Sequence, residues 1–243
     1  MRAMILCAGY GTRLGELTRD TPKPLLKAQG ISLLDYILEN LKLHGCSDVM
    51  INLHHHAEQI RQSLEPWRQR GLAPHFSFEK HLLGTAGAVK KVNGFFTGEE
   101  AFLVHYGDVV TNVDLTEMLK FHKARGAVAT LLVHKRSRSN SSLTFDETFR
   151  VTAFVERPPE SYWDTVDTTW VNSGVMVLSP SVLDLVPDDG PSDWPRDIFP
   201  KLIPSGQLYA HCLDRYRVAV DSPERLQQLV KDIDDGKMRI GRA

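Results

Sequence analysis

The residue types best suited to chemistry gather near the N-terminus, in the segment 6–26. Four apolar residues at 3–6 precede it and predict a short buried strand. Three glycines follow that strand: Gly9, Gly11 and Gly15. Glycine leaves no Cβ between the backbone and a ligand, so the main chain can approach closely. Arg13 and Lys23 stand in the same segment, and exposed N–H groups together with two cations could hold several phosphates.

Several interpretations compete for this segment. A dinucleotide-binding fingerprint needs G-x-G-x-x-G and then a helix, but Gly15 comes one residue late, and Pro22 and Pro24 disfavour an uninterrupted helix. The ATPase pattern G-x-x-x-x-G-K-[ST] does not occur in the chain. A long open loop that wraps a nucleoside triphosphate and a glycine-rich surface turn with two solvated charges remain. The combination of Arg13 with a Lys23 held between prolines favours the triphosphate loop.

Composition narrows the class of protein. A chain of 243 residues can build one large domain or two small ones. Its 29 basic and 30 acidic residues leave no positive excess to neutralise nucleic acid. No apolar run approaches the roughly 18 residues of a membrane span, and the N-terminus enters a strand without a signal peptide. Three cysteines without paired spacing predict a reducing, cytoplasmic setting, and Cys7 is interpreted as a small apolar filler.

Apolar periodicity predicts alternating strands and helices in the first half of the chain. The expected strands are 3–6, 49–53, 75–79, 101–104 and 128–134, and the expected helices are 31–44, 57–69, 85–92 and 115–125. Such alternation implies crossover connections and a mostly parallel sheet. Ligands of these sheets lie at the carboxyl ends of strands, so the segment 6–26 and Asp108 are expected to meet there.

The second half changes character, with a strand pair expected within 143–155. The other expected elements are strands at 171–178, 208–213 and 217–220 and helices at 197–203 and 223–235. No linker interrupts the chain, which predicts a single domain over 1–243 with functional halves of about 1–135 and 136–236. After residue 236 no hexapeptide repeat of a β-helix occurs, so none is expected at the C-terminal end.

Acidic and histidine residues at strand ends are candidate metal ligands. Asp108 follows a strand and a glycine, where it could hold Mg²⁺ or simply form a turn. His54, His55 and His56 are consecutive, and consecutive residues rarely converge on one ion, so a strand exit leading into a helix is favoured over a metal site.

The run LCAGYGTRL followed by TPKPLL resembles the signature of the sugar-1-phosphate nucleotidyltransferases, also called NDP-sugar pyrophosphorylases. That signature is G-x-G-T-R, nine residues and then Lys, and the resemblance continues nearly to the C-terminus. Glu16 departs from it, since the family often has Pro there. The resemblance implies that Arg13 and Lys23 are catalytic. It also implies nucleotide contacts at Leu6, Ala8, Gly9, Gly11 and Thr12.

A second motif, LGTAGA at 83–88, resembles the family segment that lines the nucleobase. It implies nucleotide contacts at Gly84, Thr85 and Gly87. Small residues at a helix start let a flat base lie against the backbone, with N–H groups free to read its edge. Close helix packing is the alternative explanation of these small residues. The preceding residues 79–82 depart from the acidic, proline-containing run common in the family.

The resemblance also implies substrate-binding residues, among them Gly107. Glu156 and Arg157 resemble a Glu-Lys-Pro motif in which Glu holds sugar hydroxyls and Lys, replaced here by Arg157, holds the sugar phosphate. Asn172 matches an Asn-x-Gly motif that contacts the sugar, and a polar start to a buried strand is the alternative. Asp221, in Val-Asp-Ser-Pro-Glu, resembles the cytidylyltransferase form of the second metal ligand; a helix cap is the alternative, and Ala219 occupies the usual position.

The resemblance implies an α/β fold, a three-layer α/β/α, Rossmann-like nucleotide-binding domain with a mostly parallel mixed sheet. The expected reaction transfers a nucleotidyl group from a nucleoside triphosphate to a sugar 1-phosphate, with Mg²⁺ on Asp108 and Asp221. GTP with mannose or mannoheptose 1-phosphate is expected first, and uridylyl or thymidylyl transfer to a hexose 1-phosphate second. A regulatory homologue that binds nucleotide sugar remains open, and a dinucleotide-dependent oxidoreductase is disfavoured by the late glycine. Related enzymes are often dimers or tetramers, so a homodimer is expected.

Overall fold

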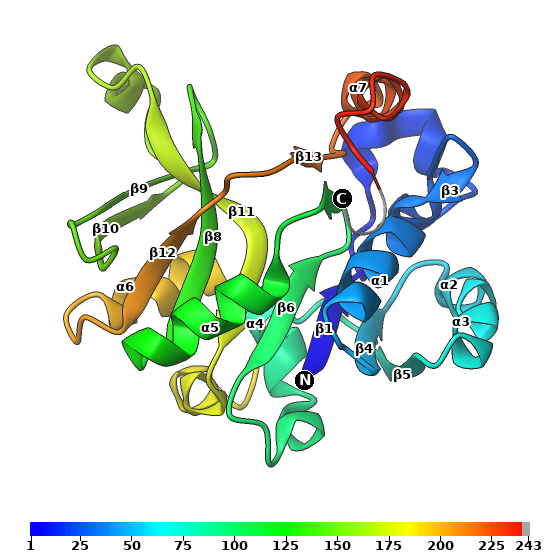
Figure 1. The fold of residues 1–243 in the computed structure, drawn as a ribbon, viewed down its shortest axis with the longest axis horizontal. Coiled ribbons are helices and arrows are strands. Elements are labelled where there is room, and N and C mark those ends of the chain that lie inside the picture. The colour runs from blue at the N-terminus through cyan, green and yellow to red at the C-terminus, as the bar shows by residue number, and fades with distance from the viewer. Residues whose placement is uncertain (240–243) are drawn as a thin grey trace. The chain divides into compact units, whose positions relative to one another are not determined.

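The computed structural model describes residues 1–239, and the chain forms two compact units (Figure 1). The first unit combines 1–82, 104–115 and the segment from Asp214 on, and the second combines 83–103 with 116–213. These units do not coincide with the expected halves that meet near residue 135, and that functional division stays a prediction. Residues 240–243, the end of the segment for which no β-helix was expected, lie outside the described residues.

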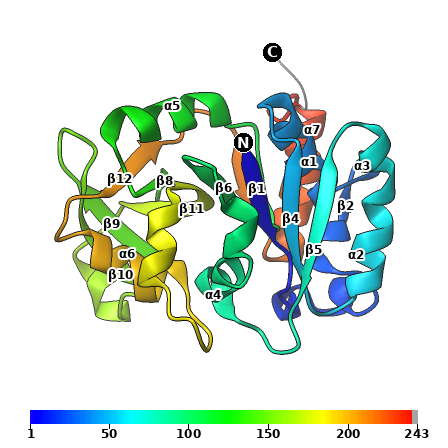
Figure 2. The ribbon, with the colours of Figure 1, turned by 90° about the horizontal axis from the view of Figure 1, so that it is seen from below.

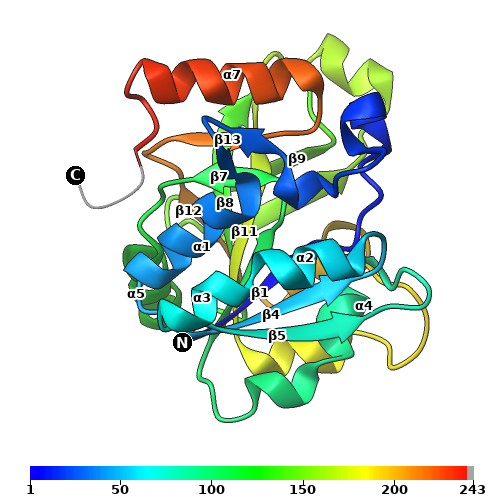
Figure 3. The same ribbon diagram turned by 90° about the vertical axis from the view of Figure 1, so that its right-hand side faces the viewer.

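The first unit contains a parallel sheet. Its strands are β1 (Arg2–Leu6), β4 (Asp48–Leu53) and β5 (Ala73–Phe78), and β6 (Phe102–Tyr106) lies on the other side of β1. The pairs β1–β4 and β4–β5 are parallel and end at Leu6–Asn52 and Leu53–Phe78. Crossover helices connect these strands and lie on one face of the sheet (Figure 3). They are α1 (Leu33–Leu43), α2 (Ala57–Ser63) and α3 (Glu65–Gln69).

Two helix predictions needed correction in this unit. The helix expected at 31–44 begins at Leu33, because Ile31–Ser32 form strand β3, which pairs with β2 (Lys27–Ala28). Ser32 then caps the helix, with its hydroxyl accepting the Asp35 N–H at 3.0 Å. The single helix expected at 57–69 is wrong. It is divided at Leu64, because a proline tolerated in the first turn of α3 could not stand inside one continuous helix.

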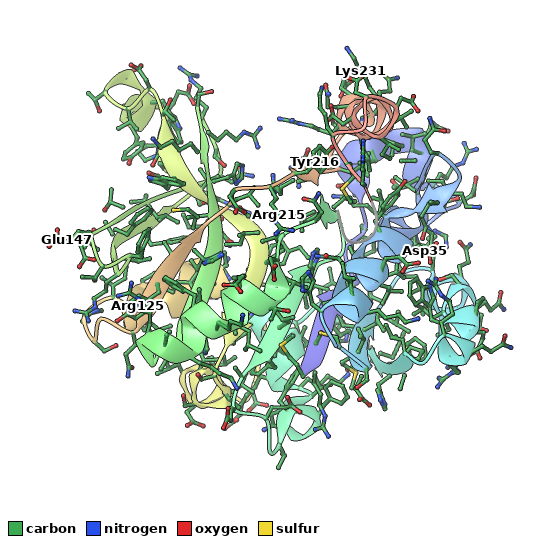
Figure 4. All side chains as sticks on the ribbon, viewed as in Figure 1. Asp35, Arg125, Glu147, Arg215, Tyr216 and Lys231 are labelled. Atoms are coloured by element: carbon green, nitrogen blue, oxygen red, sulfur yellow. The ribbon has the colours of Figure 1, made fainter. Side chains whose placement is uncertain are left out.

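The C-terminal segment completes the first unit. Strand β13 (Arg217–Ala219) pairs antiparallel with β7 (Val109–Thr111), and α7 (Pro223–Asp234) covers them. Buried side chains join these elements to the N-terminal segment in one apolar cluster, which includes Leu14, Leu26, Leu33, Val110, Val218, Val220 and Leu229. Tyr216 lies beneath α7, the helix that carries Lys231 (Figure 4), and its hydroxyl donates to Asp232 at 3.0 Å. Residues 214–239 are therefore packed against the segment that carries the glycines.

The second unit has a mixed sheet. Strand β8 (Ala129–Arg136) runs antiparallel to β11 (Thr169–Leu178) and parallel to β12 (Leu208–Cys212), and β9 (Ser141–Phe145) forms a hairpin with β10 (Val151–Glu156). Helix α5 (Leu115–Arg125) lies on one face, and α4 (Gly84–Lys90) and α6 (Phe199–Leu202) lie on the other (Figure 2). The helix expected at 197–203 begins earlier, as a π-helical turn over Trp194–Ile198.

The predicted fold class is confirmed. Parallel and antiparallel strand pairs form mixed sheets with flanking helices, and the crossovers of the first unit are those of an α/β protein. Within residues 1–239, no helix combines the length and the apolar character that a membrane crossing requires.

Candidate functional site

The glycine-rich segment leaves β1 as an open loop and continues as two short 3₁₀ helices, Thr12–Thr18 and Lys23–Leu25. The first is interrupted at Gly15 (φ 55°, ψ −126°), so the prolines and glycines do prevent a long helix here. Gly11 has φ +69°, and a Cβ on it would lie 3.1 Å from Thr18 Cγ2 and 3.3 Å from Lys23 Cβ. The absence of that Cβ lets the chain fold back and bring Lys23 beside the loop.

Two pairs of opposite charge form within the first unit. Lys23 Nζ donates to Asp108 Oδ2 at 2.5 Å, and Arg13 Nη1 donates to Asp221 Oδ2 at 3.3 Å. The Lys23 and Asp108 side chains are only 13% and 25% exposed, whereas Arg13 is 66% exposed, so the first pair is much less screened by water. The two cations and the two carboxylates assigned from sequence therefore meet in two direct contacts.

The strand ends explain how residues so far apart in sequence come together. Val220 N donates to Asp108 O at 2.8 Å and extends the β7–β13 ladder, so Asp221 follows directly after the partner of Asp108. Gly107 N donates to Leu6 O at 2.9 Å. A Cβ on Gly107 would lie 2.7 Å from that oxygen, so only glycine allows this approach to β1.

Cys7 occupies the first loop position after β1 and is buried. Burial, and then the nearby charge of Asp108, raise the pKa of the Cys7 thiol well above its usual range. A thiol that stays protonated is a poor nucleophile, which agrees with the interpretation of Cys7 as a filler of space.

The three consecutive histidines lie between β4 and α2, as expected for a strand exit. His54 Nδ1 donates to the carbonyl oxygen of Glu79 at 2.7 Å, since a carbonyl only accepts, and its Nε2 lies 2.8 Å from the Tyr10 hydroxyl. His56 has φ 53° at the N-terminus of α2, and its Nε2 donates to Arg19 O at 3.2 Å. Within residues 1–239, no three His, Cys, Asp or Glu side chains are grouped as a metal site would require.

The second motif starts α4 in the second unit, but three of its N–H groups are already bonded. Ala86 N and Gly87 N donate to Ser192 O at 2.8 and 3.1 Å, and Thr85 N donates to Asp193 Oδ1 at 2.9 Å. The expectation that these groups are free to read a base edge is therefore wrong. The packing that was the alternative explanation is present, since a Cβ on Gly84 would lie 2.5 Å from Ser192 O.

The residues assigned to the sugar phosphate also lie in the second unit. Glu156 ends β10, and burial raises the pKa of its half-buried carboxyl, while the charge of neighbouring Arg157 opposes that rise. Arg157 has φ +51°, an uncommon conformation for a residue with a side chain, and its N–H donates to Asn140 O at 2.7 Å. Asn172 stands at the irregular part of β11, where its Oδ1 accepts the Gly174 N–H at 3.1 Å.

Sequence reasoning predicted that the loop and Asp108 meet, but it missed the residues that hold the loop in position. Of the remaining predicted nucleotide contacts, Ala8 is buried, whereas Gly9 and Thr12 are exposed. Asn52, at the end of β4, binds the loop at Cys7 and was not predicted. One asparagine in an apolar strand was its only signal.

Comparison with known proteins decides the family. Residues 2–217 match the family model described as nucleotidyl transferase. The chain belongs to the nucleotidyl transferase family. Its relatives include the UTP–glucose-1-phosphate uridylyltransferase of Synechocystis, 32% identical over 88% of this chain and 58% of the relative. A mannose-1-phosphate guanyltransferase of Yarrowia lipolytica is 30% identical over 92% of this chain and 61% of the relative. The chain thus spans about three fifths of the length of these curated relatives.

Solved structures of two proteins have a similar fold. HddC from Yersinia pseudotuberculosis has a TM-score of 0.79 at 24% identity, covering 96% of this chain and 99% of that chain, and it has also been solved complexed with GMP-PN. A putative glucose-1-phosphate thymidylyltransferase from Bacillus anthracis, in complex with a sucrose, has a TM-score of 0.85 at 18% identity, covering 100% and 98%. At these identities the likeness shows the fold.

Proposed function

We propose that this nucleotidyl transferase moves a nucleotidyl group from a nucleoside triphosphate to a sugar 1-phosphate and releases pyrophosphate. The observation that carries the proposal is the meeting of Lys23 with Asp108 and of Arg13 with Asp221 beside the glycine loop. A triphosphate needs cations, and its metal needs carboxylates, so one place supplies both. The names of the relatives, a uridylyltransferase and guanyltransferases acting on sugar 1-phosphates, support the same reaction.

The chain's own groups suit a reaction driven by alignment and charge. A phosphomonoester has a second pKa of roughly 6, so a sugar 1-phosphate is already largely anionic near neutral pH and needs no strong general base. Its oxygen attacks the α-phosphorus in line as pyrophosphate leaves. Arg13 and Lys23 neutralise the triphosphate and the charge that develops on the leaving group, while the loop backbone aligns it. Arg157 is proposed to hold the phosphate of the sugar 1-phosphate, and Glu156 and Asn172 are proposed to contact the sugar.

The two aspartates fit Mg²⁺, which takes hard oxygen ligands and usually one or two carboxylates beside substrate phosphates. Asp108 and Asp221 each contact a cationic side chain in this structure, so the surroundings of both carboxylates already hold positive charge. Bound Mg²⁺ would supply charge neutralisation to the phosphates. The proposed ligands are Asp108 and Asp221, with Asp221 taking the place of the usual ligand position at Ala219.

Among substrates we propose GTP with mannose or mannoheptose 1-phosphate. Guanyltransferases acting on mannose 1-phosphate recur among the relatives, and the Yersinia structure was solved with GMP-PN. The uridylyltransferase of Synechocystis, at 32% identity, supports UTP with glucose 1-phosphate as the second candidate.

The test is pyrophosphate release with Mg²⁺ across GTP, UTP, dTTP, CTP and ATP, each against a panel of sugar 1-phosphates. One strongly preferred pair is expected, with GTP as the nucleotide. Lys23→Ala and Asp108→Ala should each lower kcat/KM at least about 100-fold, because each removes a charge that faces the reacting phosphates. Lys27→Ala, at an exposed lysine on β2, is the matched control and should keep the wild-type rate.

If the folded protein releases no pyrophosphate with any pair of the panel, the proposed reaction is overturned. Binding of a nucleotide sugar without turnover would then assign the protein as a regulatory homologue. Near wild-type rates in both Lys23→Ala and Asp108→Ala would reject the proposed roles of these residues even if the reaction itself is observed.

A further inference from the structure

A side-chain bridge takes over where the strand ladder of the first unit ends. The register of β1 with β4 stops at Leu6 opposite Asn52, so the next N–H, that of Cys7, lies beyond the ladder. Asn52 supplies the missing partner, because its Oδ1 accepts the Cys7 N–H at 2.7 Å. The first peptide of the glycine loop is therefore held by a side chain that is only 4% exposed.

The other end of the Asn52 amide is bonded to a buried carboxylate. Asn52 Nδ2 donates to Glu79 Oε1 at 2.7 Å, and Glu79 is 2% exposed. Glu79 stands just beyond the end of β5, and its own N–H donates to Leu53 O at 2.7 Å. The main chain of Glu79 is thus fixed by the sheet and does not depend on the loop for its position.

The main-chain N–H of Cys7 determines which way the amide of Asn52 points. An N–H only donates, so it must face the amide oxygen, Oδ1. The NH₂ group of Asn52 then faces Glu79, whose Oε1 accepts from it. Both contacts therefore agree with a single orientation for the amide.

A second line of hydrogen bonds reaches the loop from the same strand end. His54 Nδ1 donates to Glu79 O at 2.7 Å, and its Nε2 lies 2.8 Å from the Tyr10 hydroxyl. Cys7 and Tyr10 stand on either side of Ala8 and Gly9. The loop is thus held on both sides of the two residues expected to approach the triphosphate.

We propose that Asn52 is a positioning residue for nucleotide binding, with Glu79 as the group that orients it. The inference rests on the proposed function, since it assumes that the loop from Cys7 to Gly11 binds a nucleoside triphosphate. Asn52 does not touch the nucleotide. It fixes the Cys7 peptide, and the loop backbone that follows is thereby held in a binding conformation before the ligand arrives.

The test compares the dissociation constant of the preferred triphosphate, together with KM and kcat, among four variants. Asn52→Leu leaves the buried Cys7 N–H without its partner and should weaken nucleotide binding about tenfold, with a smaller change in kcat. N52D should weaken it too, because two carboxylates then face each other. E79Q alone should weaken nucleotide binding less than N52D does, since the new amide oxygen can still accept from Asn52. In N52D/E79Q the new amide donates to the new carboxylate, so binding should recover to within about threefold of wild type.

Asn40 offers a matched control, because it is also a buried asparagine whose amide bonds main chain, donating to Val113 O at 3.2 Å. Asn40→Leu should lower the melting temperature without changing the nucleotide dissociation constant. Equal effects of Asn52→Leu and Asn40→Leu on binding, or no recovery in N52D/E79Q, would overturn the inference. If Asn52→Leu does not fold, N52D against N52D/E79Q decides it. A wild-type protein that binds no triphosphate would overturn the proposed function, and the inference with it.

Discussion

Three glycines near the proposed nucleotide site differ in whether the fold requires glycine at their position. Gly11 has φ +69°, and Gly107 would place a Cβ 2.7 Å from Leu6 O. Gly9 has neither constraint, since its φ is not in the left-handed region and a Cβ on it would meet no described atom within 4 Å. The fold of the described residues therefore tolerates a side chain at Gly9, whereas a ligand lying against the loop would not.

We expect Gly9→Ala to fold with a free energy of unfolding within about 0.5 kcal/mol of wild type, because nothing in the fold is displaced. The KM for the triphosphate should rise at least about tenfold, since the methyl group would occupy space next to the backbone that the phosphates approach. Gly94→Ala is the control, because Gly94 is equally unconstrained and belongs to the other compact unit. An unchanged KM in Gly9→Ala would contradict close approach of the nucleotide at this residue.

At the residue scale, sequence reasoning succeeded where charge and strand ends sufficed. Lys23 and Asp108 are in contact, as expected if ligands gather at the carboxyl ends of strands. Asn52 and Glu79 were not predicted, because an asparagine and a glutamate that bond each other across 27 positions leave no local pattern. Free N–H groups at the start of α4 were wrongly predicted, because their acceptors, Ser192 and Asp193, are distant in sequence.

At the scale of elements, the start of α4 depends on the loop at 190–193. Gly84 has φ +73° there, and a Cβ on it would lie 2.5 Å from Ser192 O and 3.1 Å from Asp193 Oδ1. Backbone oxygen cannot move aside without breaking the bonds that it accepts from Ala86 and Gly87. The glycine is therefore a structural requirement of this helix start, whatever the nucleotide does.

Gly84→Ala should combine backbone strain with this clash and lower the free energy of unfolding by about 3 kcal/mol. Gly98→Ala is the matched control in the same unit, since Gly98 has φ +84° but open space around the Cβ position. Gly98→Ala should lower the free energy of unfolding only by the backbone strain, about 1 kcal/mol. Urea unfolding of the two variants measures the difference, and equal losses would show that the loop at 190–193 yields to the side chain.

Long, strongly patterned elements were predictable, and short ones held by distant partners were not. Helix α5 has the bounds that its apolar spacing predicts, Leu115–Arg125. Strand β7 was not predicted, because three residues carry too little pattern and its partner β13 lies more than 100 positions later. That ladder is the element that brings Asp221 next to Asp108, so the second proposed metal ligand could be suggested from a motif but not located.

At the scale of the whole molecule, each unit contains one deeply buried histidine. His105 is 1% exposed and donates from Nδ1 to Tyr106 O, while His122 is 2% exposed and lies between two hydroxyls. Ser179 donates to Ala127 O, so its oxygen accepts from His122 Nε2, and His122 Nδ1 accepts from Thr130. Burial is the main cause that lowers the pKa of each ring to about 4, so both rings are neutral near pH 7.

These two histidines should make the protein sensitive to mild acid. The unfolded chain binds protons at an ordinary histidine pKa of 6.5, whereas the folded chain resists them until about 4, so stability is full above about pH 7 and falls as the pH drops through this window. Between pH 7 and pH 5 each histidine should lower the free energy of unfolding by roughly 2 kcal/mol.

His122→Gln, which can still bond the hydroxyls, should shrink by that amount the difference between the free energies of unfolding measured with urea at the two pH values. His81→Gln, at an exposed ring, is the comparison. A pH difference as large in His122→Gln as in wild type would mean that the folded protein protonates His122 as readily as the unfolded chain does, which would contradict a pKa lowered by burial.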